Sequence, residues 1–217
     1  MIFNLGFGQK TQDTLFIKKQ RLKGAHQSIF FEQNKTSKYY VGLTDFSFGD
    51  DYKDTYNYSL TFLKSNRIKL IHKKTILPSK KWITLKQYNN KYYAYYPCDF
   101  YTYYKCSVND STYIDWSGEG PIANKIIEQK KLDNKTYLLK LTGQHEKYKI
   151  LIIHIIDSEK GIAIFEERRK KNVVNYYLMI MAEKINEVPL IVNNCLTEKQ
   201  IELTFQQPNF KILINKK

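Results

Sequence analysis

Residues 147–182 read KYKILIIHIIDSEKGIAIFEERRKKNVVNYYLMIMA, and this stretch decides the fold class. From Lys147 to Ile156, one set of alternate positions carries Tyr, Ile, Ile, His and Ile, while the other carries Leu and Ile beside a lysine. Residues 173–182 are likewise apolar at both sets of positions. Successive side chains of a strand point to opposite faces, so a strand that is apolar on both faces is covered on both. The polar turn at 157–161 predicts that the strand before it and the strand after it form a β-hairpin.

The same rhythm extends upstream, where short aromatic or β-branched segments alternate with Asn, Asp or Gly turns. The expected strands are 91–96, 100–106, 111–116, 122–129, 136–141, 147–156, 162–166 and 173–182. A spacing of roughly 8 to 12 residues with local turns is typical of a sandwich or an up-and-down barrel. We therefore predict an all-β fold in which an antiparallel meander closes into a barrel of about eight strands.

An additional β-rich N-terminal portion is expected over residues 9–80, before a boundary at the Pro78-Ser79 turn. The meander barrel then occupies 81–196 and a C-terminal extension 197–217, unless 9–217 is one domain. The other segments expected to be strands are 28–32, 39–48, 58–63, 67–72, 201–205 and 210–214, with 82–88 either a short helix or a lead-in strand and a helix start at 197–200.

The net charge of +14 raises the question of polyanionic partners. Only four of the 35 basic residues are arginines, and the lysines are scattered along the chain. Arginine is favoured for bidentate contacts with phosphates and bases, so a solvated lysine surface is the better interpretation and nucleic acid is an unlikely partner. The longest apolar run, 150–156, is far shorter than the roughly 20 residues of a transmembrane helix.

The first residues, Met1 to Gly8, resemble the end of an export signal. They are apolar and carry glycines at positions 6 and 8, which suits a signal peptidase site before Gln9. Under this hypothesis 1–8 is the remnant of a signal peptide and the protein is exported to the periplasm or cell surface. The alternative is an apolar N-terminal strand in a cytoplasmic protein.

The chain has three cysteines, Cys98, Cys106 and Cys195. They form neither a CxxC pattern nor a Cys/His cluster, so no metal or cofactor site is expected. Cys98 follows the first expected strand of the meander and Cys195 follows the last. The first and last strands of a closed barrel are neighbours, so a Cys98–Cys195 disulfide is geometrically sensible. Three buried thiols in a reducing compartment are the alternative.

The segment from Trp82 to Tyr93, with Tyr88-Asn89-Asn90 at its centre, resembles the opening of the lipocalin-like (calycin) barrels. Those barrels begin with Gly-x-Trp on the first strand, whereas this chain has Asn89 or Asn90 in place of the glycine and Tyr92 or Tyr93 in place of the tryptophan. The resemblance covers residues 82–196 and rests mainly on topology. It implies a barrel that binds a small apolar ligand.

The leading hypothesis is therefore an exported, non-enzymatic barrel that binds a small apolar or aromatic ligand. The proposed cavity-lining residues are Tyr92, Tyr96, Tyr103, His154, Tyr177 and Met179. His154 has an alternative role as a hydrogen-bonded core histidine, and the tyrosines as barrel wall. A packed β scaffold that meets an envelope protein or glycan is the rival function. A hydrolase using Asp115 and Glu119 is a third, because paired carboxylates can perform acid–base chemistry.

Overall fold

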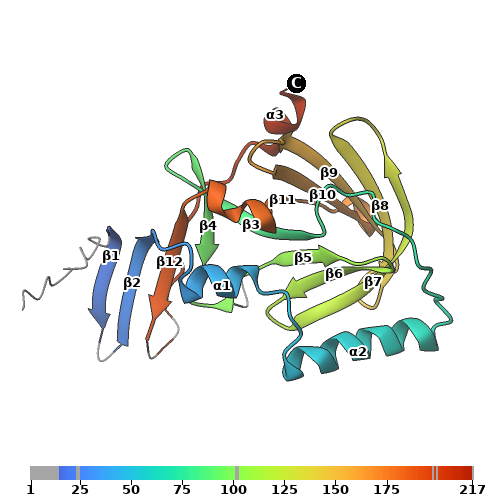
Figure 1. The fold of residues 1–217 in the computed structure, drawn as a ribbon, viewed down its shortest axis with the longest axis horizontal. Coiled ribbons are helices and arrows are strands. Elements are labelled where there is room, and N and C mark those ends of the chain that lie inside the picture. The colour runs from blue at the N-terminus through green and yellow to red at the C-terminus, as the bar shows by residue number, and fades with distance from the viewer. Residues whose placement is uncertain (1–14, 23–24, 101–102, 197, 199, 217) are drawn as a thin grey trace, which may run out of the picture.

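Eight antiparallel strands close into a barrel in the computed structural model, which describes residues 15–216 except 23–24, 101–102, 197 and 199. The barrel strands are β3 (Lys81–Tyr88), β5 (Lys105–Val108), β6 (Thr112–Ser117), β7 (Gly120–Lys131), β8 (Thr136–Gly143), β9 (Lys149–Asp157), β10 (Ile162–Arg169) and β11 (Val174–Met181). Apart from β4, their order in the chain is their order around the barrel, and β3 closes it by pairing with both β11 and β5 (Figure 1). The predicted meander and its closure are confirmed.

A sheet extension, consisting of four further strands, leaves the barrel beside β3. These strands are β4 (Lys91–Tyr96), β12 (Leu190–Cys195), β2 (Ala25–Glu32) and β1 (Phe16–Leu22), in that order from β3 outward. The first half of β3 pairs within the barrel and its second half pairs with β4. Figure 1 shows the extension projecting from the barrel, with β1 farthest away.

The expectation that 91–96 is the first barrel strand is wrong. Asn89 and Asn90 both have positive φ angles, 47° and 60°, which suits the tight two-residue turn of a β-hairpin. This turn folds β4 back onto the second half of β3, outside the barrel. The residues that suggested the calycin opening motif therefore belong to a hairpin in the extension, and the first barrel strand is 81–88.

Two segments expected to be strands are helical. Residues 39–48 contain most of α1 (Lys38–Thr44), and 58–63 lie in α2 (Asp50–Ser65). In α2 the residues Tyr56, Ser59 and Leu63 recur at helical spacing, and Ser59 and Leu63 are buried. The Ser59 hydroxyl accepts a hydrogen bond of 2.9 Å from the Ala123 amide, which fixes α2 against β7. The N-terminal portion is thus part strand and part helix.

Other expected elements are shorter or of a different type. Residues 67–72 and 201–205 carry no regular structure, and 210–214 form α3 (Phe210–Asn215) instead of a strand. In the described part of 100–106, strand structure begins at Lys105. The remaining elements are the 3-10 helices η2 (Lys170–Asn172) and η3 (Ala182–Glu187). Strand β12 was not anticipated. The helix start expected at 197–200 lies partly outside the described residues.

The barrel wall is apolar on both faces, as the alternation predicted. The inner face holds one cluster of buried residues, including Trp82, Phe165 and Met179. The outer face of β3, β10 and β11 packs with α1, η3 and α3 in a second cluster that includes Ile164 and Leu43. Helix α2 lies outside the barrel along β7 (Figure 1).

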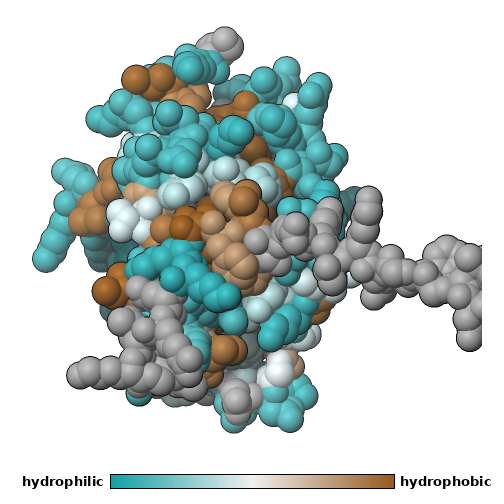
Figure 2. Space-filling view, turned by 90° about the vertical axis from the view of Figure 1, so that its left-hand side faces the viewer, coloured by the Kyte–Doolittle hydropathy of each residue, from teal (hydrophilic) through white to brown (hydrophobic). Residues whose placement is uncertain are grey.

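Figure 2 looks onto the end of the molecule that carries β1 and β2, where apolar residues gather between hydrophilic ones. At the start of this part of the chain, Leu15 and Phe16 are 60% and 46% exposed. The proposed signal remnant, 1–8, lies outside the described residues. Among the helices that the structure describes, none combines the length and the apolarity required to cross a bilayer.

Candidate functional site at the barrel mouth

One end of the barrel lumen, the space that the barrel strands enclose, is filled by side chains. We call it the packed end, and its residues are Trp82, Leu139, Leu151, Ile153, Ala163, Phe165 and Met179. Each of them is at most 2% exposed. The rings of Trp82 and Phe165 lie 5.1 Å apart although β11 separates their strands. This half of the lumen is a core, and Met179 belongs to it.

The other end of the lumen, the mouth, carries a buried lysine between two carboxylates. Lys149 on β9 lies with its Nζ 2.7 Å from Asp115 on β6 and 3.4 Å from Glu167 on β10. Strands β6 and β9 are separated by β7 and β8 in the sheet, so the contact between Lys149 and Asp115 crosses the lumen. Burial alone would lower the pKa of Lys149, but attraction by Asp115 and Glu167 outweighs it and leaves that pKa raised. Lys149 is therefore a stable cation and not a nucleophile.

The Asp115 carboxylate is surrounded by donors. Besides Lys149, its Oδ1 accepts a hydrogen bond of 2.8 Å from the Tyr104 hydroxyl and its Oδ2 accepts one of 2.9 Å from Asn124. Asn124 has room for its side chain because β8 ends in Gly143, where an added Cβ would lie 2.2 Å from the Asn124 Oδ1. The sequence thus places a glycine where the polar network needs space.

Arginine and tyrosine complete the network on either side. The Arg169 Nε donates to Glu167 at 2.6 Å. The Tyr104 and Tyr113 hydroxyls lie 2.9 Å apart, and burial raises the pKa of both well above the usual tyrosine value. Burial likewise raises the pKa of the Cys106 thiol beneath them, so this cysteine is not an activated nucleophile.

A cavity of about 300 Å³ opens over this network, and we call it the charged compartment. Its walls include Asp115, Lys149, Glu167 and Arg169, with Glu119 on the β6–β7 turn beside them. Asp115, Glu167, Lys149 and Arg169 neutralise one another, while Glu119 and Glu146 add two carboxylates to the lining, so the compartment suits hydrogen-bonding groups of a ligand more than an anion.

A second cavity, of about 220 Å³, adjoins it and is walled mainly by aromatic and apolar side chains. We call it the aromatic compartment, and its lining comprises Thr84, Lys86, Tyr95, Pro97, Tyr103, Tyr104, Tyr177, Glu202, Leu203 and Phe205. Tyr104 and Tyr177 line both compartments, and their ring centroids are 4.9 Å apart. The tyrosine pair is therefore the wall between the two halves of the mouth.

Lys86 is the cation that lines the aromatic compartment, which also contains the Glu202 carboxylate. None of the ion pairs among the described residues involves Lys86, and burial lowers its pKa although Glu202 partly opposes this effect. The Glu202 carboxylate is occupied, since it accepts hydrogen bonds from Tyr95, from the Asn193 side chain at 2.9 Å and from the Asp99 amide at 2.6 Å. An anionic group in this compartment would find Lys86 without displacing another partner.

The C-terminal segment that supplies Leu203 and Phe205 is held at several points. The Gln206 amide donates to the Gln87 carbonyl at 2.9 Å, and the Gln200 amide lies 3.2 Å from the Cys98 sulfur. Cys98 and Cys195 form a disulfide, with their Cα atoms 5.6 Å apart. The pairing follows from β4 and β12 being parallel neighbours in the extension and not, as expected, from closure of the barrel.

The six proposed ligand residues do not converge on one cavity. Tyr177 lines both compartments and Tyr103 lines the aromatic one. The Tyr103 hydroxyl is buried and has no hydrogen-bond partner in the described part of the chain. Tyr92 and Tyr96 lie on β4, outside the barrel, and pack in the outer cluster with α1. His154 also lies outside, because it pairs in register with Ile164 of that cluster.

His154 instead contacts a carboxylate on the neighbouring strand, with its Nε2 3.2 Å from Glu166. This agrees with its alternative role as a hydrogen-bonded histidine. The expected carboxylates Asp115 and Glu119 both line the charged compartment, but the Asp115 oxygens are taken up by Lys149, Asn124 and Tyr104. Asp115 is therefore engaged by three donors and is not available as a free acid or base beside Glu119, which is exposed on the β6–β7 turn.

Sequence reasoning missed Lys149, Glu167 and Lys86. A signal for Lys149 was present, because it occupies an alternate position shared with Leu151, Ile153 and Ile155. A charged residue on a buried face needs partners. Over the part of the chain that the structure describes, no group of three His, Cys, Asp or Glu side chains gathers in a way that could hold a metal ion.

Comparison of this chain with family models, curated proteins and solved structures finds no match.

Proposed function

We propose that this protein is a lipocalin-like binding protein, without enzymatic activity, that holds a small aromatic ligand bearing an acidic group at the barrel mouth. The observation that carries the proposal is the aromatic compartment, with Lys86 as an unpaired cation among tyrosine and phenylalanine rings. Ligand sites are typically concave, largely apolar and equipped with a few polar groups that orient the ligand. The packed end leaves no room for an apolar ligand inside the lumen, so we place the binding site at the mouth.

The aromatic preference follows from the walls of this compartment. Tyr104 and Tyr177 offer ring surfaces from the barrel side, and Phe205 offers one from the C-terminal segment. Offset or edge-to-face contacts between rings add roughly 0.5 to 1.5 kcal/mol beyond the burial of area. The polar substituents of a larger ligand could extend past the tyrosine pair into the charged compartment.

The acidic group follows from Lys86. Burial disfavours its charge, and a carboxylate at the ammonium would restore the preference for the charged form. Because the pKa of Lys86 is lowered in the free protein, affinity for an acid should decline as the pH rises through that lowered value and Lys86 loses its proton. An uncharged analogue should show no such decline.

Phenylacetate and phenylacetamide form a matched pair of probes for calorimetric titration. We expect the acid to bind about tenfold or more tightly than the amide, since a charge-assisted hydrogen bond contributes roughly 1.5 to 3 kcal/mol. Lys86→Met should abolish this difference, while Tyr177→Ala should weaken both ligands. Lys91→Met removes an exposed lysine nearby and should change neither. Failure of both probes to bind, or an unchanged preference in Lys86→Met, would overturn the proposal.

Export is part of the proposal. The Cys98–Cys195 disulfide supports it, since disulfides persist mainly in oxidising compartments. Mass spectrometry of the protein isolated from its natural host should find Gln9 as the first residue. Retention of Met1 would contradict the export hypothesis and leave ligand binding untouched.

The rival function, an envelope scaffold for a protein or glycan, is supported by the packed end alone. A scaffold needs no cavity, whereas the two compartments of the mouth together provide enough space for a small molecule. The ligand-binding hypothesis is therefore preferred.

A further inference from the structure

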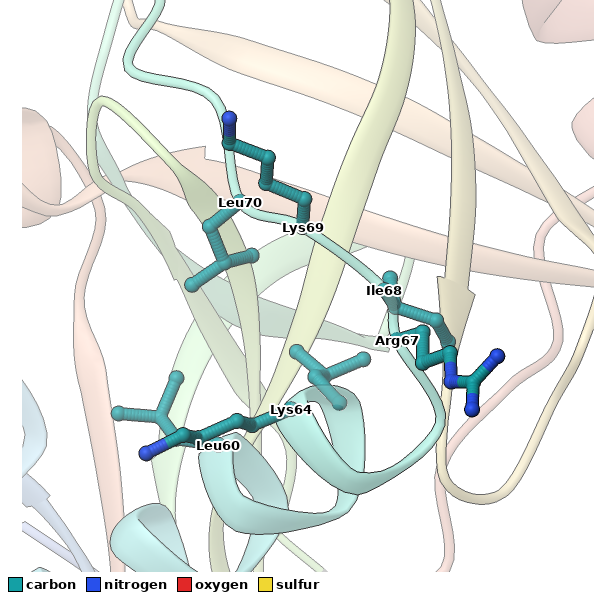
Figure 3. A pocket seen from close by; sticks show the side chains of 7 residues that line it. Leu60, Lys64, Arg67, Ile68, Lys69 and Leu70 are labelled. Carbon is teal, nitrogen blue, oxygen red and sulfur yellow. The ribbon is translucent and has the colours of Figure 1, made fainter.

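A surface cavity of about 410 Å³ lies outside the barrel, at the C-terminal end of α2. Leu60 and Leu63 reach it from the helix, and Ile68 and Leu70 reach it from the segment that follows. In Figure 3, Leu60 and Leu70 approach the cavity from opposite sides, while the cationic ends of Lys64, Arg67 and Lys69 point outward in different directions. The cavity therefore has an apolar floor and a cationic rim.

The charge around this cavity is not balanced. We call residues 64–74 the basic segment; it contains Lys64, Arg67, Lys69, His72, Lys73 and Lys74. No Asp or Glu occurs anywhere from Thr55 to Cys98. In the described structure His72 lies 3.7 Å from Asp110, but Lys64, Arg67 and Lys69 take part in no ion pair.

Apolar side chains are exposed beside these cations. Ile71, within the basic segment, is 62% exposed, and Ile76 just beyond it is 38% exposed. Exposed aliphatic side chains contribute nothing to the binding of a soluble polyanion. Surfaces that lie in a membrane interface combine both, because the cations attract anionic headgroups while the apolar groups enter the acyl boundary.

The backbone at Arg67 provides a separate indication. The Ile68 amide donates to the Leu63 carbonyl at 2.8 Å and the Arg67 amide donates to Lys64 at 3.0 Å, which is the Schellman pattern of a helix C-terminus. The residue at the left-handed position of this motif is usually glycine, but here it is Arg67, with φ of 57°. Strained residues of this kind cluster at functional positions.

We propose that the basic segment and its apolar cavity dock the protein on a bilayer that contains anionic lipid. The cations supply the attraction to the headgroups, Ile71 enters the interface, and the cavity floor offers a place for part of an acyl chain. The surface lies outside the barrel mouth, so the proposal does not depend on the ligand proposed above.

Co-sedimentation of the full chain with vesicles tests the proposal. Binding is expected to vesicles of phosphatidylglycerol and phosphatidylcholine, to be absent with phosphatidylcholine alone, and to weaken as salt is added. The triple variant Lys64→Gln, Arg67→Gln, Lys69→Gln should lose roughly a hundredfold in partitioning, given the contribution of each basic residue near an anionic surface. Ile71→Ser should lose several-fold.

A matched control removes the same charge elsewhere. The triple variant Lys18→Gln, Lys91→Gln, Lys211→Gln replaces exposed lysines on other parts of the molecule and should retain most of the binding. Equal losses in the two triple variants would show that only the net charge acts, and would overturn the proposal. It would equally be overturned if a DNA oligonucleotide bound as tightly as the vesicles and Ile71→Ser had no effect on either.

Arg67→Gly separates function from folding. Glycine relieves the left-handed strain, so the variant should melt at a higher temperature than the native chain while binding the anionic vesicles several-fold less tightly. A variant that gains stability and keeps full binding would remove Arg67 from the docking surface and contradict the role given to its strained backbone.

Discussion

The packed end and the mouth of the lumen are built from the same strands and differ only in which residues stand at the inward positions. On β9, Leu151 and Ile153 face the packed end, while Lys149 on the same face reaches the mouth. On β10, Phe165 likewise faces the packed end and Glu167 lies at the mouth. A shift of one inward position along a strand therefore separates a close-packed core from a cavity lined by charges.

The two ends are therefore stabilised by different interactions. The packed end depends on dispersion and the removal of apolar surface from water, so it tolerates no loss of volume. The mouth depends on each buried charge having its partners, so it tolerates loss of volume but not loss of one charge. A ligand site can occupy only the end where side chains leave space.

The largest effect should come from truncating the packed end. Phe165→Ala removes a fully buried ring that packs on Trp82, and should lower the free energy of unfolding by about 4 kcal/mol. Tyr177→Ala, at the half-buried mouth, should cost less than half as much because water can fill the space. Urea denaturation of the two variants measures both values. Equal losses would mean that the two ends are packed alike.

The disulfide supports the mouth from the extension. Replacing both Cys98 and Cys195 with serine should lower stability by about 4 kcal/mol, at the upper end of the usual range for a disulfide, because the bridge spans 97 residues. It should also weaken phenylacetate binding, since the segment bearing Leu203 and Phe205 lies beside it. Treatment of the native chain with dithiothreitol should reproduce both effects and leave the double variant unchanged. A stable, fully binding reduced protein would contradict this role.

Breaking the charge network should cost slightly less. Lys149→Met leaves Asp115 and Glu167 in the lumen without their shared cation and should lower stability by about 3 kcal/mol, by urea denaturation. The triple variant Lys149→Met, Asp115→Asn, Glu167→Gln removes all three charges and should recover much of the loss. If the single variant is as stable as the native chain, the network does not hold the mouth together.

The sequence predicted the barrel well where strand and turn signals alternate locally. Strands β6 to β11 were predicted close to their observed bounds, because each pairs with its neighbour in the chain. Errors arose where distant contacts decide. The aromatic residues of α2 suited a strand equally well, and its helix is fixed by packing on β7, far along the chain. Strand β12 pairs with β2 and β4, neither of which is adjacent in sequence.

The site was predictable only in part for the same reason. Tyr177 and Asp115 were named from local patterns, and both line the mouth. Lys149 could be recognised as a cation on an apolar face, but its partner Asp115 is 34 residues away and is reached only across the closed lumen. Lys86 lies at the point where β3 leaves the barrel, and nothing in its local sequence marks that exit.

Alkaline pH should weaken the mouth before the packed end. The pKa of Lys149 is raised by its carboxylates, so its stabilisation is complete below the unfolded value of 10.5 and is lost as the pH rises through the higher folded value. Tyr104 and Tyr113 also have raised pKa values in the folded protein. Above about pH 10 their hydroxyls therefore ionise in the unfolded state first, which favours unfolding.

The free energy of unfolding should therefore fall between about pH 9 and pH 11, as followed by urea denaturation at each pH. Tyr104→Phe should make this fall shallower, because one of the raised phenolic groups is gone. A pH-independent stability over this range would mean that the mouth charges and hydroxyls are open to water in the folded state.

The smallest effect concerns the floor of the mouth, where the two ends meet at Cys106. Its thiol has no exposed surface and burial raises its pKa, so both access and thiolate content are low. Without reductant, iodoacetamide should modify no cysteine of the native protein and one cysteine after unfolding in urea. Rapid labelling of the folded protein would show that the network above Cys106 opens often enough to admit solvent, and the boundary between a closed core and an open mouth would then lie deeper in the lumen than the structure places it.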